Sequence, residues 1–199
     1  MIYEIIQTHA GADAHFMIKD HENHLLGAID YHKQVFKISL GDQDFELRRG
    51  YSDELTEKHE VKKAPYIIYE HHKDVGALYE STMLDDQLIF DQVLYHGHLY
   101  SLFAIHFSSR DMALNIFEGS TQVGQLELER QLTKDEMYTF HLYVQDEDDT
   151  LKASIFSIMY YYMRYKAKPH QDHIYKSDEA RDYAYSKYDP QFIATLSTK

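Results

Sequence analysis

Apolar and polar residues alternate in many short stretches between Ile2 and Val144, most clearly in residues 36–40, 126–129 and 138–144. A period of two residues places successive side chains on opposite faces of a strand, so the pattern predicts half-buried strands of an antiparallel sheet. Short polar breaks separate the stretches and predict hairpin turns. These breaks include residues 41–43, 85–86, 96–98 and 108–111. The pattern gives about twelve candidate strands.

A short pattern recurs in residues 18–29, 68–78 and 116–126. In each copy a strand ends on a carboxylate, a polar turn follows, and the next strand opens with an apolar residue and a glycine. A glycine at this place permits a bulge or a sharp bend. The glycines are Gly27, Gly76 and Gly124. A period of about 48 residues holds about four strands, so three copies predict one closed barrel rather than a propeller. Chance similarity between short hairpins is the alternative explanation.

Residues 151–165 break the strand pattern with a run that is apolar nearly all the way round a helix. Asp148 and Asp149 place negative charge at the positive end of that helix, and Pro169 marks its end. Such a helix has to be surrounded on all sides, and a barrel of about twelve strands is too wide for its own side chains to fill. The sequence therefore predicts a mostly β fold, a closed antiparallel barrel of about twelve strands enclosing one apolar helix near the C-terminus.

This order of elements resembles the tubby C-terminal-like fold, which includes the tubby proteins, the LURP-one-related proteins and the phospholipid scramblases. Residues 148–165 carry the resemblance best, because the family's central helix would lie there, and residues 18–27 look like the family's first hairpins. The resemblance implies a barrel domain with a central helix over residues 1–167. It leaves residues 168–199 as an aromatic tail that packs on the barrel or on a partner.

The resemblance implies a fold more than an activity. Tubby domains bind phosphoinositide headgroups through paired basic residues, but no residue-by-residue match to that site is found here. The nearest local features are Arg48-Arg49 and Lys62-Lys63, and pairs of this kind are common on solvated surfaces. The membrane helix and cysteine-rich segment of the scramblases have no counterpart in this sequence, and the LURP-one-related resemblance carries no established chemistry.

Charge and composition reduce the range of partners and locations that we expect for this protein. The formal net charge is −13, which repels nucleic acid and anionic bilayers, so we expect neither nucleic-acid nor phosphoinositide binding. The apolar helix is shorter than the roughly twenty residues of a membrane span, which argues against a transmembrane protein. The chain has no cysteine, and its N-terminal residues lack the pattern of a signal peptide, so we expect a cytoplasmic location.

Histidines are the candidates for chemistry. The sequence contains 14, with close pairs at His21 and His24, His71 and His72, His96 and His98, and His170 and His173. None of these pairs forms a recognised metal-binding or catalytic motif, and no phosphate-binding loop or nucleophile motif is present. The sequence therefore assigns no catalytic, cofactor-binding or metal-binding residue, and it implies no cofactor.

The tail adds a candidate interaction segment. Its tyrosines make it too aromatic for a plain linker, Ser177 opens a predicted helix, and Asp189-Pro190 would stop it. Tyrosine is favoured at interfaces, so the tail is a candidate contact for a protein partner or a second copy. The sequence favours a non-enzymatic binding or scaffold protein that recognises a protein or lipid through the barrel surface. The alternative is a metal-dependent barrel enzyme that uses rim histidines.

Overall fold

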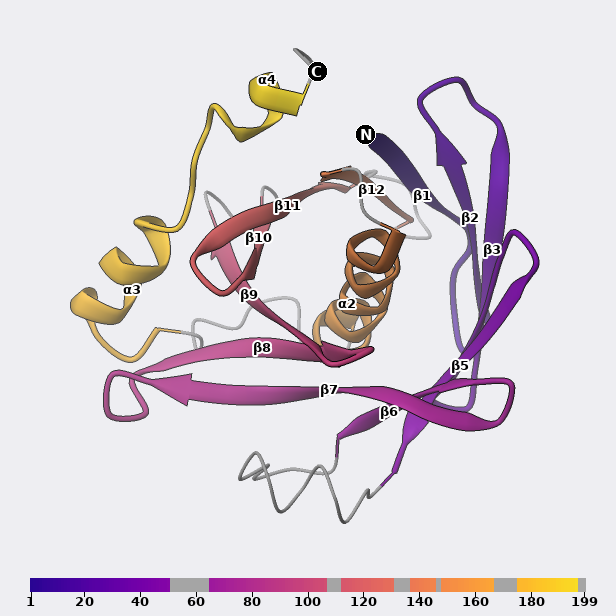
Figure 1. Ribbon diagram of the computed structural model, residues 1–199, viewed down its shortest axis with the longest axis horizontal. Coiled ribbons are helices and arrows are strands. Elements are labelled where there is room, and N and C mark those ends of the chain that lie inside the picture. The colour runs from indigo at the N-terminus through magenta and orange to yellow at the C-terminus, as the bar shows by residue number, and fades with distance from the viewer. Residues whose placement is uncertain (51–64, 107–111, 131–136, 146–147, 167–174, 197–199) are drawn as a thin grey trace.

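The computed structural model describes residues 1–50, 65–106, 112–130, 137–145, 148–166 and 175–196. Twelve antiparallel strands close into one barrel, in which β1 pairs with both β2 and β12 and every other strand pairs with its chain neighbours (Figure 1). This confirms the predicted class and the predicted strand number. The strands are β1 (Ile2–His9), β2 (Ala14–Asp20), β3 (Leu25–His32), β4 (Val35–Leu40), β5 (Gln43–Arg49), β6 (Tyr66–Glu70), β7 (Lys73–Met83), β8 (Leu88–Tyr95), β9 (His98–His106), β10 (Met112–Glu118), β11 (Thr121–Arg130) and β12 (Tyr138–Val144).

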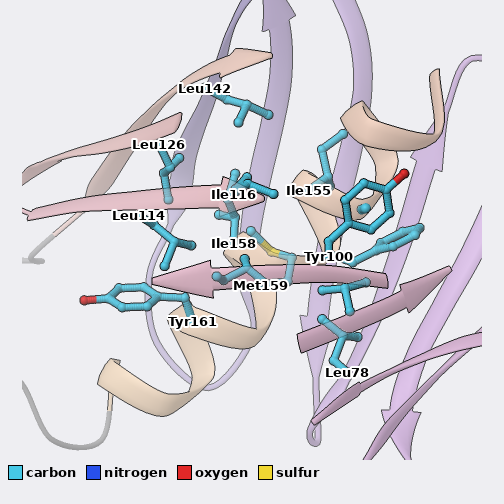
Figure 2. Close-up of a cluster of buried hydrophobic side chains, with 14 of the residues drawn as sticks. Leu78, Tyr100, Leu114, Ile116, Leu126, Leu142, Ile155, Ile158, Met159 and Tyr161 are labelled. Carbon is cyan, nitrogen blue, oxygen red and sulfur yellow. The ribbon is translucent and has the colours of Figure 1, made fainter. Parts of the chain in front are cut away.

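The apolar and polar residues that alternate in the sequence lie on the inner and outer faces of the barrel, respectively. In β4, Phe36 and Ile38 are buried inside the barrel, while the alternate residues Lys37 and Ser39 are exposed. The inner side chains form one large apolar core, in which Leu114, Ile116, Leu126 and Leu142 lie on neighbouring strands (Figure 2). Burial of these side chains is the main source of stability of such a barrel.

The recurring glycines lie at three equivalent irregularities of the wall. Strand pairing shifts register opposite each of them, between Ile18 and Lys19, between Ile68 and Tyr69, and between Ile116 and Phe117. Each shift accommodates an extra residue and bends the sheet, as the glycine pattern predicted. A Cβ on Gly27 or Gly76 would come 2.1 Å from a carbonyl oxygen of the adjacent strand. Only glycine allows that approach.

The helix α2 (Asp148–Lys166) follows β12 and begins three residues before the predicted start at Leu151, so its two aspartates form the first turn. Figure 1 shows strands on several sides of it, and contacts connect it with β7, β8, β11 and β12. Ile155, Ile158 and Met159 are fully buried among the strand side chains in Figure 2. Its aromatic side chains meet further strands.

Aromatic contacts extend around the helix. Phe156 lies edge-on to Phe45 of β5 and Tyr95 of β8, each with ring centroids 5.2 Å apart. Tyr162 lies edge-on to Phe16 of β2 at 5.0 Å, and its hydroxyl accepts a hydrogen bond from Gln7 Nε2 of β1 at 3.0 Å. Each edge-to-face pair adds about 0.5–1.5 kcal/mol to the gain from burial.

Polar side chains of α2 are buried as well, which the apolar pattern did not predict. The hydroxyls of Ser154 and Ser157 donate to the carbonyls one turn earlier, each at 2.6 Å. Lys152 is 3% exposed and pairs with Asp148. In the part of the chain that the structure describes, no helix has the length and apolar character needed to cross a membrane.

Residues 175–196 lie against the outside of the barrel (Figure 1). The helices α3 (Asp178–Tyr185) and α4 (Phe192–Leu196) contact β8 and β9, and β12, respectively. Ser177 caps α3 by accepting a hydrogen bond from the Ala180 N–H at 3.1 Å, as its position in the sequence predicted. α3 ends at Tyr185, before the predicted stop at Asp189.

Candidate functional site

A groove of about 600 Å³ lies on the outer face of β3, β4, β5 and β6. It forms there because the period of two sends every second side chain of these strands outward. Its lining includes Tyr69 and the charged residues Asp30, Lys37, Asp44, Glu46 and Arg48. His71 and His72, in the turn between β6 and β7, also line the groove.

Opposite charges alternate across the floor of the groove. Asp30 of β3 lies opposite Lys37 of β4, and Lys37 lies opposite Glu46 of β5 in the strand register. Glu46 in turn lies opposite Tyr69 of β6. Cross-strand pairs of opposite charge contribute about 0.2–1 kcal/mol each. The row therefore supports the strand register and also presents both signs of charge to a ligand.

Arg48 contacts two residues of this row, Tyr69 and Glu46. Its guanidinium lies 4.3 Å from the centre of the Tyr69 ring, and its Nε lies 3.3 Å from a carboxylate oxygen of Glu46. Asp44 accepts a hydrogen bond of 2.6 Å from the Ser39 hydroxyl. Three carboxylates face two basic side chains in the groove, so carboxylates outnumber cations when the histidines are neutral.

The other basic side chain of the pair, Arg49, lies apart from this row. Its guanidinium carbon is 5.8 Å from the centre of the Tyr66 ring. Lys62 and Lys63 lie outside the described residues. Arg48 and Arg49 therefore face different aromatic rings, Tyr69 and Tyr66.

The histidine pairs lie mostly in turns at the rim from which α2 starts. His96 opens the turn between β8 and β9, with Glu70 at 3.8 Å from one ring nitrogen and Asp149 at 3.4 Å from the other. His98 Nδ1 lies 2.6 Å from Glu118, and His24 Nδ1 lies 3.1 Å from Asp20. Each of these histidines is therefore engaged with a carboxylate of the chain.

The rim does not provide a metal centre among the residues that can be described. No three histidine or carboxylate side chains of these residues are arranged to hold a metal ion. His170 and His173 lie outside the described residues. The metal-dependent alternative therefore has no donor set to support it in this part of the chain.

Two polar groups lie buried just below the rim. Among the described residues the Tyr95 hydroxyl, which is fully buried, has no hydrogen-bond partner, and burial, followed by the charge of Glu70, raises its pKa. Lys152 lies beside Phe45, which like Tyr95 contacts Phe156, and its ammonium is 5.9 Å from the centre of the Phe45 ring. Neither was a candidate in the sequence, because a tyrosine or lysine at a strand or helix end is usually solvated.

Comparison of the chain with protein-family models, with curated proteins and with solved structures found no match. Any inference about function therefore depends on the described surface itself. Sequence reasoning singled out Arg48, His71 and His72 but missed the groove, since most of its charged residues are ordinary solvent-facing positions of strands.

Proposed function

We propose that this protein is a non-enzymatic binding protein whose barrel closes around α2 and whose groove on β3–β6 holds a basic segment of a partner protein. The barrel of twelve strands followed by a helix supports a tubby-like architecture as part of this proposal. The absence of cysteine is in keeping with a cytoplasmic location. The groove itself is the observation that carries the proposal.

The chemistry of the groove favours a protein segment over a lipid headgroup. Asp44 and Glu46 offer carboxylates to lysine or arginine, while Lys37 accommodates an acidic residue or a carbonyl of the same segment. The net charge of −13 attracts basic partners over long range and repels anionic membranes. A filled barrel interior fits this proposal, because Phe156 and Ile158 occupy the core where an open barrel would hold a ligand.

A labelled peptide that alternates lysine and serine tests the proposal by fluorescence anisotropy. We expect binding that weakens with salt, and a loss of about tenfold in affinity when Asp44→Asn and Glu46→Gln are combined. The matched control is the double variant Glu22→Gln, Asp85→Asn, which removes two exposed carboxylates from turns outside the groove. It has the same net charge as the groove variant.

Equal affinity of the groove and control variants would contradict the proposal, because general attraction to an acidic surface would then account for the binding. Binding to vesicles that contain anionic lipid, lost on Lys37→Ala or Arg48→Ala, would instead indicate a lipid-binding groove. Thermal melting of each variant excludes unfolding as the cause of a lost interaction.

A further inference from the structure

Three aromatic rings surround the ammonium group of Lys187 on the outer face of the barrel. Its Nζ lies 5.9 Å from the ring centre of Phe103, 5.6 Å from that of Phe117 and 4.9 Å from that of Tyr183. Phe103 and Phe117 belong to β9 and β10, and Tyr183 belongs to α3. All three distances lie within the range of a cation–π interaction. We call these three rings the aromatic cage.

The cage is rigid on its barrel side. Phe103 is 5% exposed and Phe117 is 9% exposed, and the two rings meet edge-on at 77° with centroids 6.0 Å apart. Phe90 of β8 stacks on Phe103 at 5.2 Å and fixes its orientation. Tyr183 lies at 66° to Phe103. The rings therefore form walls at large angles to one another, which is the geometry of a site for a cationic group.

The ammonium group of Lys187 is stabilised by aromatic ring faces. Within the described residues, no ion pair joins Lys187 to an acidic side chain, and its ammonium group faces the three rings. The lysine follows the C-terminal end of α3, where the carbonyl dipoles add partial negative charge. An ammonium group is strongly hydrated, and three rings compensate poorly for the loss of that water.

We propose that the aromatic cage is a binding site for methylated ammonium groups, and that Lys187 occupies it in the absence of such a ligand. A methylated ammonium is weakly hydrated and fits ring faces better than lysine does, which is why aromatic cages recognise it. The acidic surface of the protein raises the local concentration of cations. Lys187 therefore acts as an internal competitor that an external cation displaces.

Displacement of Lys187 leaves α3 attached to the barrel. Lys176 N–H donates to the Gln87 carbonyl at 2.9 Å, and the Tyr175 hydroxyl donates to the Ala104 carbonyl. Ala180 and Ala184 of α3 are fully buried. The third wall of the cage thus stays in place when the lysine leaves.

Titration with tetramethylammonium, followed by NMR of the full chain, tests the proposal. We expect Lys187→Ala to bind this cation at least about tenfold more tightly than the unmodified protein, because the competitor is gone. Lys176→Ala, which removes an exposed lysine of the same tail, is the control and should leave the affinity unchanged. Adding Tyr183→Leu to Lys187→Ala should reverse the gain, since leucine keeps an apolar wall without a π face.

Two probes then distinguish the source of the ligand. Tighter binding of a trimethyllysine peptide than of choline indicates a methylated protein, whereas binding of phosphatidylcholine vesicles indicates a lipid headgroup, and either result supports the cage. The absence of tetramethylammonium binding by folded Lys187→Ala, or binding that Tyr183→Leu and Phe117→Leu both leave unchanged, overturns it. The groove variants Asp44→Asn and Glu46→Gln should not alter the result, so the two proposals fail independently.

Discussion

Tyr162 shows how a single polar group is accommodated in the core. Its side chain is 3% exposed, and its hydroxyl accepts a hydrogen bond from Gln7 Nε2 at 3.0 Å. Burial raises its pKa to about 12, while the hydrogen bond from Gln7 opposes this shift. The hydroxyl therefore stays protonated in the folded protein at pH values where an exposed tyrosine loses its proton.

This shift predicts the response of the protein to alkali. A tyrosine whose pKa is raised on folding contributes stability below pH 10, and this stability is lost as the pH rises from about 10 to 12. We expect the urea midpoint to fall over that window, and to fall less steeply in Tyr162→Phe. Tyrosinate absorbance, recorded alongside, should rise together with unfolding. A midpoint that is flat up to pH 12 would contradict the burial of this hydroxyl.

Gly76 and Gly124 occupy equivalent places in the repeat but have different surroundings. A Cβ on Gly76 would lie 2.1 Å from the Leu94 carbonyl oxygen, whereas on Gly124 its nearest neighbour is a side-chain carbon of Ile116 at 3.2 Å. We expect Gly76→Ala to cost about 3 kcal/mol and Gly124→Ala about 1 kcal/mol, because a side chain yields more readily than a paired strand. Urea unfolding of both variants measures the difference, and equal costs would contradict it.

At the level of elements, the core position of α2 can be tested by placing a charge on it. Phe156 and Ile158 are at most 1% exposed, so Phe156→Asp or Ile158→Asp would bury an unpaired charge, and we expect the chain not to fold. Phe156→Ala should be milder, at roughly 3–5 kcal/mol for the cavity that it leaves. Leu25→Asp, at a side chain that is 63% exposed, is the control. Wild-type melting temperatures for both aspartate variants would refute the position of the helix.

The ion pair at the start of α2 has unequal partners. Lys152 is almost fully buried, whereas the side chain of Asp148, 2.5 Å away, is 74% exposed. Asp148→Asn leaves a buried ammonium without its carboxylate, and we expect a loss of about 1–3 kcal/mol. Lys152→Met removes the buried charge and leaves a solvated aspartate, so it should be nearly neutral or stabilising. The changes in melting temperature of the two variants should therefore differ in sign or size. Equal decreases would contradict the prediction.

At the level of the whole molecule, the net charge of −13 dominates long-range interactions. We expect negligible co-sedimentation with phosphoinositide vesicles at physiological salt, because each basic side chain near the surface contributes only about 1 kcal/mol. Vesicles that contain cationic lipid should bind and serve as the positive control. Firm phosphoinositide binding that weakens when Lys62 and Lys63 are neutralised would contradict this prediction and would support a tubby-type role.

Local patterns in the sequence were sufficient for the class of fold, for the number of strands and for α2 and the start of α3, but they did not predict α4. Alternation in residues 36–40 and 138–144 predicted β4 and β12, and the recurring glycines predicted bends that the strand registers contain. Ser177 predicted the start of α3. These features depend on interactions between residues close in the chain or on the period of a single element, so the sequence determines them directly.

Only the tertiary structure decided which of these elements meet. The groove brings together residues of four strands, and the aromatic cage combines Phe103 and Phe117 with Lys187 from the tail. From the sequence alone, Lys152 would be expected to be solvated. In the structure it is buried near the start of α2. Such contacts depend on strand order, on barrel closure and on the path of the tail, and residues far apart in the chain determine these together. A sequence pattern shows on which face of its own strand or helix a side chain lies. It does not show which other element packs against that face.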